Sequence, residues 1–119
     1  MAIEQSSPEL DTELLQGYLD SLGKNIVEQM FALYCQQVDI YLKDIENAQQ
    51  HNSIVDWQAH CHKMKGAAAS VGMCQLYEQL KVLEHTDAQQ HEKVILLTEL
   101  KVANQQGISA FKRWLDSCC

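Results

Sequence analysis

The position of proline constrains the fold of this chain more than any other feature of its sequence. The single proline is Pro8, and the 111 residues that follow it contain none. Proline ends or kinks helices, because it lacks a backbone N–H and its ring clashes with the preceding turn. The β-branched residues, which favour strands, are also sparse. We therefore expect an all-α chain.

Apolar residues recur at spacings of three and four along most of the sequence, which is the period of a helix that buries one face. The pattern predicts helices over about 11–21, 24–49, 53–70, 73–85 and 88 to the end. The links between them are short, so consecutive helices should be antiparallel neighbours. The predicted fold is an antiparallel up-down four-helix bundle with a short additional N-terminal helix. The 119 residues suit a single domain over 1–119.

Local signals support the predicted helix ends. Asp11 and Ser53 each precede an apolar periodic run and are predicted N-caps. Gly72 follows the third run, where a left-handed residue commonly ends a helix. Asp87 and Gln90 have the spacing of a capping box at the start of the last helix.

The charge balance excludes several classes of partner. The chain has 9 basic and 16 acidic residues, a net charge of −7, and its one arginine is Arg113. Nucleic acid and anionic membrane surfaces require clustered Lys and Arg, so neither is an expected partner. No apolar stretch approaches the roughly 20 residues that a membrane-spanning helix needs. The start of the sequence also lacks the pattern of a signal peptide.

The cysteines favour a reducing compartment. Cys35, Cys61, Cys74, Cys118 and Cys119 are an odd number, and no C-x-x-C motif occurs. We expect reduced thiols in a cytoplasmic protein. A terminal Cys-Cys pair is also a prenylation address in small GTPases, but this sequence has no phosphate-binding loop. The pair is therefore interpreted as exposed tail thiols.

The segment 57–72, in the third predicted helix, carries most of the functional information. On a helical wheel with about 100° per residue, one arc forms an apolar core stripe. The stripe contains Trp57, Cys61, Met64, Ala68 and Val71. The far side carries an imidazole, an ammonium group and small or polar side chains. These residues are Gln58, His62, Lys65, Gly66 and Ala69.

Gly66 is unexpected at this position. A glycine inside a helix costs roughly 1 kcal/mol relative to alanine, and position 66 lies off the core stripe. One interpretation is that a large partner approaches His62 closely, with Gly66 and Ala69 leaving room for it. The alternatives are a helix–helix contact or a glycine without a role.

An exposed neutral imidazole is a competent nucleophile towards phosphorus. Lys65, one turn from His62, would place a positive charge beside phosphoryl oxygens, and charge neutralisation is a large part of phosphoryl transfer. From spacing alone, a solvated His-Lys pair on the surface is the better explanation of the pattern.

The sequence of 62–72, HKMKGAAASVG, resembles the signature of histidine-containing phosphotransfer (HPt) domains. The family pattern is His, any residue, an aliphatic residue, Lys, Gly and then small residues, with spaced leucines on the next helix. The matching later positions are Leu76, Leu80, Leu83 and Glu84. The segment most resembles the HPt module of anaerobic-type hybrid sensor kinases. Lys63 and Met64 are mild departures from the pattern.

The resemblance implies a phosphorelay intermediate. His62 would accept a phosphoryl group from a receiver-domain aspartate and pass it to another receiver, with Nε2 attacking and Nδ1 keeping its proton. Lys65 would stabilise the phosphoryl charge, and Gly66 would give clearance for docking. Glu84 is the residue chosen to hydrogen-bond His62.

The resemblance also implies the partners and the surface that they contact. We expect receiver domains of response regulators and hybrid sensor kinases to dock on a surface that includes Gln58, Ala69, Leu14 and Tyr18. The magnesium ion belongs to the receiver, so no metal or other cofactor is expected in this chain. Without a nucleotide-binding loop the chain would be a phosphoryl carrier with no kinase activity of its own. A bundle that must expose His62 should be monomeric.

His60 lies about 160° from His62 on the helix and is interpreted as a partly buried, hydrogen-bonded bundle residue.

Two other hypotheses concern the function of the whole chain. A metal site is disfavoured, because His60, Cys61 and His62 point in different directions and no histidine has Glu three residues before it. A non-catalytic helical adaptor that binds receiver or kinase domains would use the same fold without the chemistry.

Overall fold

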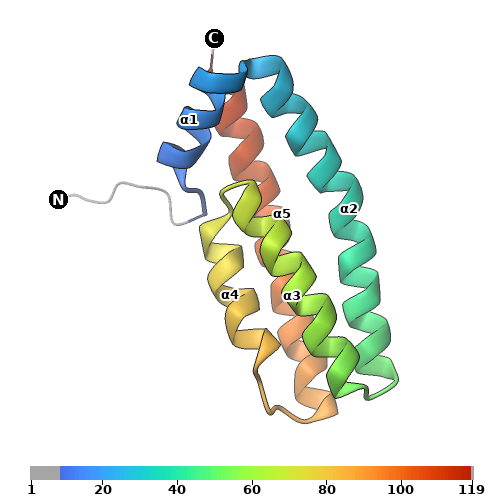
Figure 1. The fold of residues 1–119 in the computed structure, drawn as a ribbon. Helices are drawn as coiled ribbons and strands as arrows, with labels where there is room; N and C mark the ends of the chain where they lie inside the picture. Colours follow the sequence, from blue (N-terminus) through green and yellow to red (C-terminus); the bar gives the residue numbers. More distant parts are fainter. Residues whose placement is uncertain (1–8, 119) are drawn as a thin grey trace, which may run out of the picture.

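A computed structural model describes residues 9–118, which form five α-helices and no strand. The helices are α1 (Thr12–Leu22), α2 (Lys24–Gln50), α3 (Ile54–Ser70), α4 (Cys74–Glu84) and α5 (Gln90–Ser117). The last four run alternately up and down, with α1 at one end of the bundle (Figure 1). The prediction of an all-α, up-down four-helix bundle is confirmed, and the predicted helix limits lie within two residues of the observed ones.

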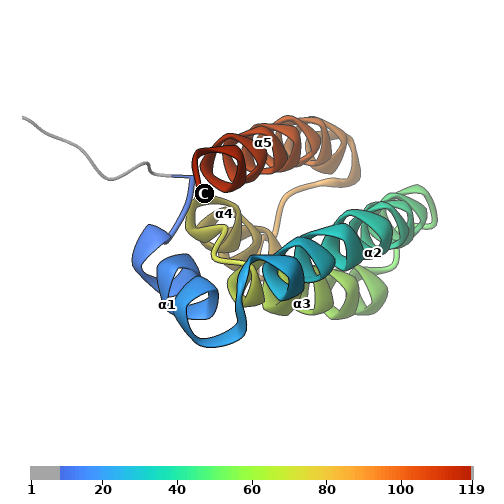
Figure 2. The ribbon, with the colours of Figure 1, turned by 90° about the horizontal axis from the view of Figure 1, so that it is seen from above.

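In cross-section, helices α2 to α5 lie at the four corners of a square, and each contacts two neighbours. Helix α3 packs against α2 and α4, and α5 packs against the same two helices. Helices α3 and α5 therefore lie diagonally across the bundle, as the view along its axis shows (Figure 2). The core between them is mostly aliphatic, and the predicted inner stripe of α3 is buried throughout.

Helix α1 is fixed to the turn between α3 and α4. Leu15 is fully buried, and the Asp11 backbone N–H donates a 2.7 Å hydrogen bond to the Gly72 carbonyl oxygen. Gly72 has φ +70°, so the left-handed conformation predicted for it is confirmed. A Cβ at this position would also lie 3.2 Å from the Leu15 side chain. The glycine therefore allows both the turn and the close approach of α1.

Two of the predicted caps are confirmed. The Asp11 carboxylate accepts a 3.1 Å hydrogen bond from the Leu14 N–H, and the Ser53 hydroxyl accepts one of 3.2 Å from the Asp56 N–H. Each cap satisfies one of the N–H groups that have no partner inside the first helical turn.

The predicted capping box of Asp87 and Gln90 is wrong. The box is formed by Gln89 and Glu92, and the Glu92 carboxylate accepts a 2.9 Å hydrogen bond from the Gln89 N–H. The chain needs residues 85–89 to cross from the end of α4 to the start of α5. Helix α5 therefore begins two residues later than predicted.

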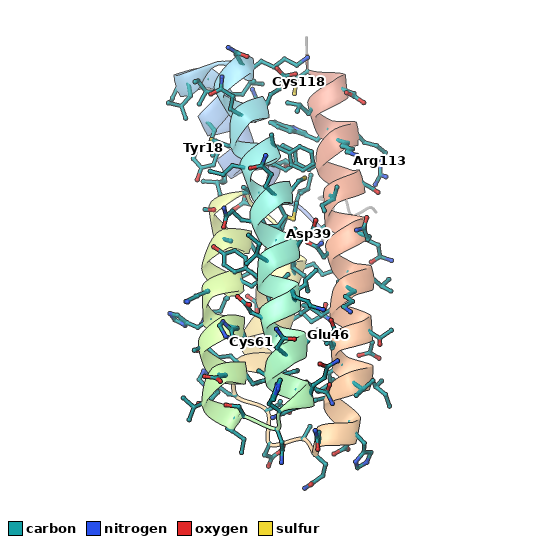
Figure 3. The ribbon with its side chains drawn as sticks, turned by 90° about the vertical axis from the view of Figure 1, so that its right-hand side faces the viewer. Tyr18, Asp39, Glu46, Cys61, Arg113 and Cys118 are labelled. Atoms are coloured by element: carbon teal, nitrogen blue, oxygen red, sulfur yellow. The ribbon has the colours of Figure 1, made fainter. Side chains whose placement is uncertain are left out.

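Polar contacts join α2 to α5 on the side of the bundle away from α4. The buried Tyr34 hydroxyl donates a 2.7 Å hydrogen bond to Asn104 Oδ1. Glu46 points from α2 towards α5 (Figure 3), where its Oε2 lies 3.6 Å from Lys101 Nζ. The two contacts fix the relative position of the longest helices.

Among the described residues, Cys35, Cys61 and Cys118 are free thiols. Cys118 is half-buried, and its Sγ lies 3.3 Å from the Trp114 carbonyl oxygen, so it is not the exposed tail thiol expected from the sequence. Cys119, the other half of that expectation, lies outside the described residues. Within 9–118, no helix combines the length and the apolar character needed to cross a membrane.

Candidate phosphotransfer site

The outward face of α3 carries the candidate nucleophile. His62 is exposed to 67% of its side chain, and Gln58, Gly66 and Ala69 are exposed beside it along the helix. On the opposite face, Cys61 is fully buried, and burial raises the pKa of its thiol to about 12. The thiol next to His62 in the sequence is therefore protonated and inert, so the imidazole is the nucleophile that this part of α3 presents.

Glu84, the last residue of α4, lies against this face of α3. Its Oε2 lies 3.0 Å from His62 Nδ1, and its Oε1 lies 2.8 Å from Lys65 Nζ. The Glu84 side chain is only 11% exposed. The expected contact between Glu84 and His62 is thus present in the structure, and Lys65 is bound to the same carboxylate.

The charge state of Glu84 decides the tautomer of His62. The Lys65 ammonium lowers the pKa of the Glu84 carboxyl below its usual value, partial burial opposes this change, and the hydrogen bond with His62 adds to the lowering. Glu84 is therefore ionised at neutral pH and can only accept hydrogen bonds. His62 Nδ1 must carry the proton, so the lone pair of the neutral ring is on Nε2.

Gly66 lies one turn after His62, on the exposed face of α3. A Cβ built on Gly66 would meet no atom within 4 Å. Among the described residues, this observation removes the helix–helix contact that was one explanation for the glycine. Gly66 leaves the helix surface beside His62 flat, as the clearance interpretation requires.

Lys65 is less exposed than the helical wheel indicated. Its side chain is 17% exposed, because it bends towards α4 and pairs with Glu84. The flexible lysine stem reaches a partner on the neighbouring helix, which a wheel of a single helix cannot show. Lys65 is therefore held beside Glu84 and is not free on the helix surface.

The comparisons with known proteins agree with this geometry. Residues 29–114 match the family model described as the Hpt domain, which is more than half of the chain. The chain belongs to the Hpt domain family. Membership supports a phosphotransfer role in two-component signalling.

The fold of this Hpt domain is also found in a solved structure. The histidine-containing phosphotransfer domain of ArcB from Escherichia coli matches with a TM-score of 0.80 and 22% sequence identity, over 92% of this chain and 95% of that chain. This likeness shows a shared fold. A search of curated proteins finds no significant match.

The structure brings together some of the residues assigned to the docking surface of the Hpt domain. Leu14 of α1 and Ala69 of α3 line one hollow of about 180 Å³, together with Gly72 and Tyr77. Leu14 and Tyr18 are half-buried, not exposed as expected, and Tyr18 packs against the core without lining this hollow. Helix α1 lies close against the bundle, which reduces the surface that these side chains can offer.

His60 occupies the predicted position but lacks the predicted hydrogen bond. It is partly buried between α3 and α2, and its Nδ1 lies 3.9 Å from Asp44 Oδ2. No atom of residues 9–118 forms a hydrogen bond with this buried nitrogen. Within residues 9–118, no group of three or more His, Cys, Asp or Glu side chains is arranged to hold a metal ion.

Two residues that the sequence did not indicate support the site. Lys93 of α5 is buried, with its Nζ 4.9 Å from the centroid of the Trp57 ring, and Trp57 Nε1–H donates a 2.7 Å hydrogen bond to the Leu83 carbonyl oxygen. Leu83 directly precedes Glu84, so this contact fixes the end of α4. Lys93 lies four residues before Leu97 on the apolar stripe of α5, which was the available signal.

His85 is the second residue. It is the C-cap of α4, is 70% exposed, and its Nε2 lies 3.7 Å from Glu84 Oε2. In the sequence, His85 is only a histidine near a helix end. A helical wheel of α3 cannot show which residues of α4 lie beside its outer face.

Proposed function

We propose that this Hpt domain is a phosphorelay intermediate that accepts a phosphoryl group on His62 from a receiver-domain aspartate and passes it to another receiver. The observation that supports this most directly is the hydrogen bond from His62 Nδ1 to ionised Glu84. It leaves the Nε2 lone pair on an exposed ring, next to a helix surface that Gly66 keeps flat.

The transfer requires little chemistry from the chain itself. The lone pair of His62 Nε2 forms a bond to phosphorus as the bond between phosphorus and the aspartyl oxygen breaks, and the carboxylate leaves with the bonding electrons. Nδ1 keeps its proton, so the ring gains positive charge, which the Glu84 carboxylate offsets. Aspartyl phosphate and phosphohistidine are both energy-rich, so the reverse reaction delivers the group to a second receiver.

Lys65 has two roles in this proposal. Its ammonium group stabilises negative charge on the phosphoryl oxygens, and it holds the Glu84 carboxylate in position through the 2.8 Å contact. Both roles favour the same state, with an oriented imidazole and a neutralised phosphoryl group.

The surface on which the receiver docks extends from His62 along α3. Gln58, Gly66 and Ala69 form its exposed line, and Leu14 adds apolar surface where it meets Ala69. The receiver supplies its own magnesium ion and acidic residues, so this chain contributes no metal ligand. The domain works as a monomer, because a dimer over this face would cover His62. Its place of action is the cytoplasm.

The proposal is tested with a panel of radiolabelled, phosphorylated receiver domains. Each is mixed with the wild-type chain, His62→Gln and His60→Gln, and all variants are first checked for an unchanged helical circular dichroism spectrum. We expect an alkali-stable, acid-labile label on the wild type and on His60→Gln, and none on His62→Gln. Label that persists on a histidine of His62→Gln would contradict the assignment. No label from any receiver would favour the adaptor hypothesis.

A further inference from the structure

The indole of Trp57 makes a contact with the end of α4 that the proposed transfer does not use. Trp57 belongs to α3, one and a half turns before His62, and is 1% exposed. Its Nε1–H donates a 2.7 Å hydrogen bond to the Leu83 carbonyl oxygen. This oxygen belongs to the last turn of α4, whose carbonyl groups have no partner inside their own helix. The bond therefore joins the buried side of α3 to the end of α4.

This hydrogen bond acts on the peptide unit that carries Glu84. The Leu83 carbonyl oxygen and the nitrogen and Cα of Glu84 lie in one planar unit. A donor that holds the oxygen therefore also restricts the position of the Glu84 Cα. From that Cα the side chain reaches α3, where its Oε2 lies 3.0 Å from His62 Nδ1.

We propose that Trp57 is a positioning residue for phosphoryl transfer, because it holds the Glu84 backbone where the carboxylate keeps the proton of His62 on Nδ1. The inference rests on the proposed function, since it assigns a role in phosphoryl acceptance by His62. Trp57 is buried, so it acts through Glu84 and not by contact with a phosphoryl group. Helix α3 thus supplies the imidazole from its outer face and positions the orienting carboxylate from its inner face.

The end of α4 needs a contact of this kind. Glu84 is the last residue of the helix, and helix ends fray because their carbonyl groups lack intrahelical partners. The Thr86 N–H also donates to the Leu83 carbonyl oxygen, at 3.3 Å, but Thr86 belongs to the connection that follows α4. That bond joins the helix end to its own continuation. The shorter bond from Trp57 joins it to the helix of the nucleophile.

The indole ring is itself fixed by the packing of the bundle. Lys93 of α5 is buried, and its Nζ lies 4.9 Å from the centroid of the Trp57 ring, a cation–π contact. Residues of α3, α4 and α5 therefore meet at this ring. A ring enclosed in this way keeps one orientation, so its N–H remains directed at the Leu83 carbonyl oxygen.

Removal of the indole N–H would loosen the Glu84 carboxylate. The hydrogen bond at one ring nitrogen of a histidine decides which nitrogen carries the proton. With a less ordered acceptor at Nδ1, the proton of His62 would also occupy Nε2. A proton on Nε2 removes the lone pair that attacks phosphorus, although the ring stays equally exposed.

Two variants remove the N–H. Trp57→Phe keeps an aromatic ring without the donor. In the second variant the benzothiophene analogue of tryptophan, in which sulfur replaces the N–H, occupies position 57 and keeps the shape of the indole. It is incorporated in a Trp114→Phe chain, because Trp57 and Trp114 are the two tryptophans of the sequence, and that chain with ordinary tryptophan is its reference. Where Trp57→Phe does not fold, the benzothiophene variant decides.

Tyr34→Phe is the matched control. It also removes a buried hydrogen bond of 2.7 Å, but one that joins α2 to α5 through Asn104. A general loss of stability should therefore affect the control and the Trp57 variants alike, whereas a loss of positioning should affect the Trp57 variants alone.

The first readout is the tautomer of His62. Nitrogen–proton correlation NMR spectra of the ring are recorded on the unphosphorylated chain at about pH 8.5, above the range in which an imidazole takes up a second proton. We expect the proton on Nδ1 and a bare Nε2 in the wild type and in Tyr34→Phe. In both Trp57 variants the Nε2 signal should move towards that of a protonated nitrogen. An unmoved signal in the benzothiophene variant, or an equal change in Tyr34→Phe, would overturn the inference.

The second readout is the rate of phosphoryl acceptance from one phosphorylated receiver at the same pH. It should fall by about tenfold in both Trp57 variants, because the attacking lone pair is no longer held in place, and stay at the wild-type value in Tyr34→Phe. A slower rate without a change of tautomer would refute the positioning role and leave Trp57 a residue of the fold. If the wild type accepts no label, the proposed function fails, whereas the NMR spectra, which need no receiver, still test the action of Trp57 on His62.

Discussion

Glu84 contacts His62 through one carboxylate oxygen and Lys65 through the other, so one residue fixes both the orientation of the imidazole and the place of the nearest cation. Its low exposure makes these contacts stronger than those of a surface carboxylate. A residue at the end of α4 therefore holds two side chains of α3 in place.

The charge of Glu84 contributes to stability in a pH-dependent way. Because its pKa is lowered in the folded chain, the contribution is present above the pKa of the unfolded chain and is lost as the pH falls through the folded value. Glu84→Gln should lower the free energy of unfolding by about 1–2 kcal/mol at pH 7, and by a smaller amount at pH 3. Urea unfolding at both pH values measures the difference.

Glu78→Gln provides the control on the same helix. Glu78 pairs with Lys81 at 2.9 Å, but both side chains are exposed to water, so its loss should cost much less stability than the loss of Glu84. Equal losses for Glu78→Gln and Glu84→Gln would show that the site carboxylate has no special environment.

Lys65→Ala tests the second contact of Glu84. Removal of the ammonium group leaves the carboxylate without its cation and takes positive charge away from the phosphoryl group. We expect transfer to His62 to slow by about tenfold or more, or the phosphohistidine lifetime to shorten, with an unchanged helical spectrum. Lys63→Ala, on an exposed position of α3, is the control, and wild-type kinetics in both variants would remove the role of Lys65.

At the scale of helices, the two faces of α3 differ in what they contact. The inner stripe packs the bundle, and the outer line of His62, Gly66 and Ala69 is open to solvent. Because no atom of the described residues lies within 4 Å of a Cβ at Gly66, a larger side chain there starts in open space and not against the bundle.

Gly66→Leu should therefore impair transfer while it stabilises the fold. Leucine has a higher helix propensity than glycine, so the free energy of unfolding should rise by about 0.5–1 kcal/mol. Transfer from a phosphorylated receiver should fall by about tenfold or more, because the side chain blocks the approach of the donor. Thermal unfolding and the transfer rate are measured on the same preparation.

Ser109→Leu places the same side chain on an exposed position of α5, diagonally across the bundle from α3. It should leave transfer unchanged. Normal transfer in Gly66→Leu would show that the clearance argument is wrong, and equal impairment by Ser109→Leu would point to a nonspecific effect of leucine.

Helices were predictable here because each carries an apolar stripe with the helical period, and because no proline interrupts them. The start of α5 was misplaced because the length of the connection depends on where α4 ends in space, which local capping signals do not encode. Gly72 was predictable as a left-handed residue, but its contact with Leu15 required the position of α1.

The site was predictable on α3 and less so elsewhere. The wheel placed His62 and Gly66 on the outer face, and the family pattern suggested Glu84. The burial of Lys65 and the proximity of His85 depend on the packing of α3 against α4. In the sequence, Lys93 resembled a surface charge. Its ammonium group is covered by the Trp57 ring, and this ring belongs to α3, so the sequence of α5 alone could not reveal the buried position.

For the whole molecule, the longest helices are held together by contacts far from His62. Tyr34 of α2 donates a hydrogen bond to Asn104 of α5, and both residues are buried. Phe31 and Phe111 stack nearby, with ring centroids 4.3 Å apart. Specific packing contacts thus join α2 to α5, while the residues of the candidate site lie on α3 and α4.

Tyr34→Phe separates the stability of the bundle from the function of the site. The phenylalanine fills the same space but leaves Asn104 Oδ1 buried without its donor, which should lower the free energy of unfolding by about 1–3 kcal/mol. For 119 residues, which lies between the domain sizes with typical values of about 4–8 °C and about 2–4 °C, a loss of 1 kcal/mol corresponds to a fall in Tm of about 4 °C. Tyr41→Phe, at a half-buried position on the same helix, should change Tm much less.

At 25 °C, well below the lowered Tm, Tyr34→Phe should accept the phosphoryl group at the wild-type rate, because α3 and α4 keep the contacts among His62, Glu84 and Lys65. A fall in both stability and transfer would mean that the α2–α5 contacts shape the site through the bundle. A fall in Tm alone, compared with Tyr41→Phe, would show that the two roles belong to different helices. The contacts between α2 and α5 would stabilise the bundle, and α3 and α4 would hold an accessible, oriented imidazole.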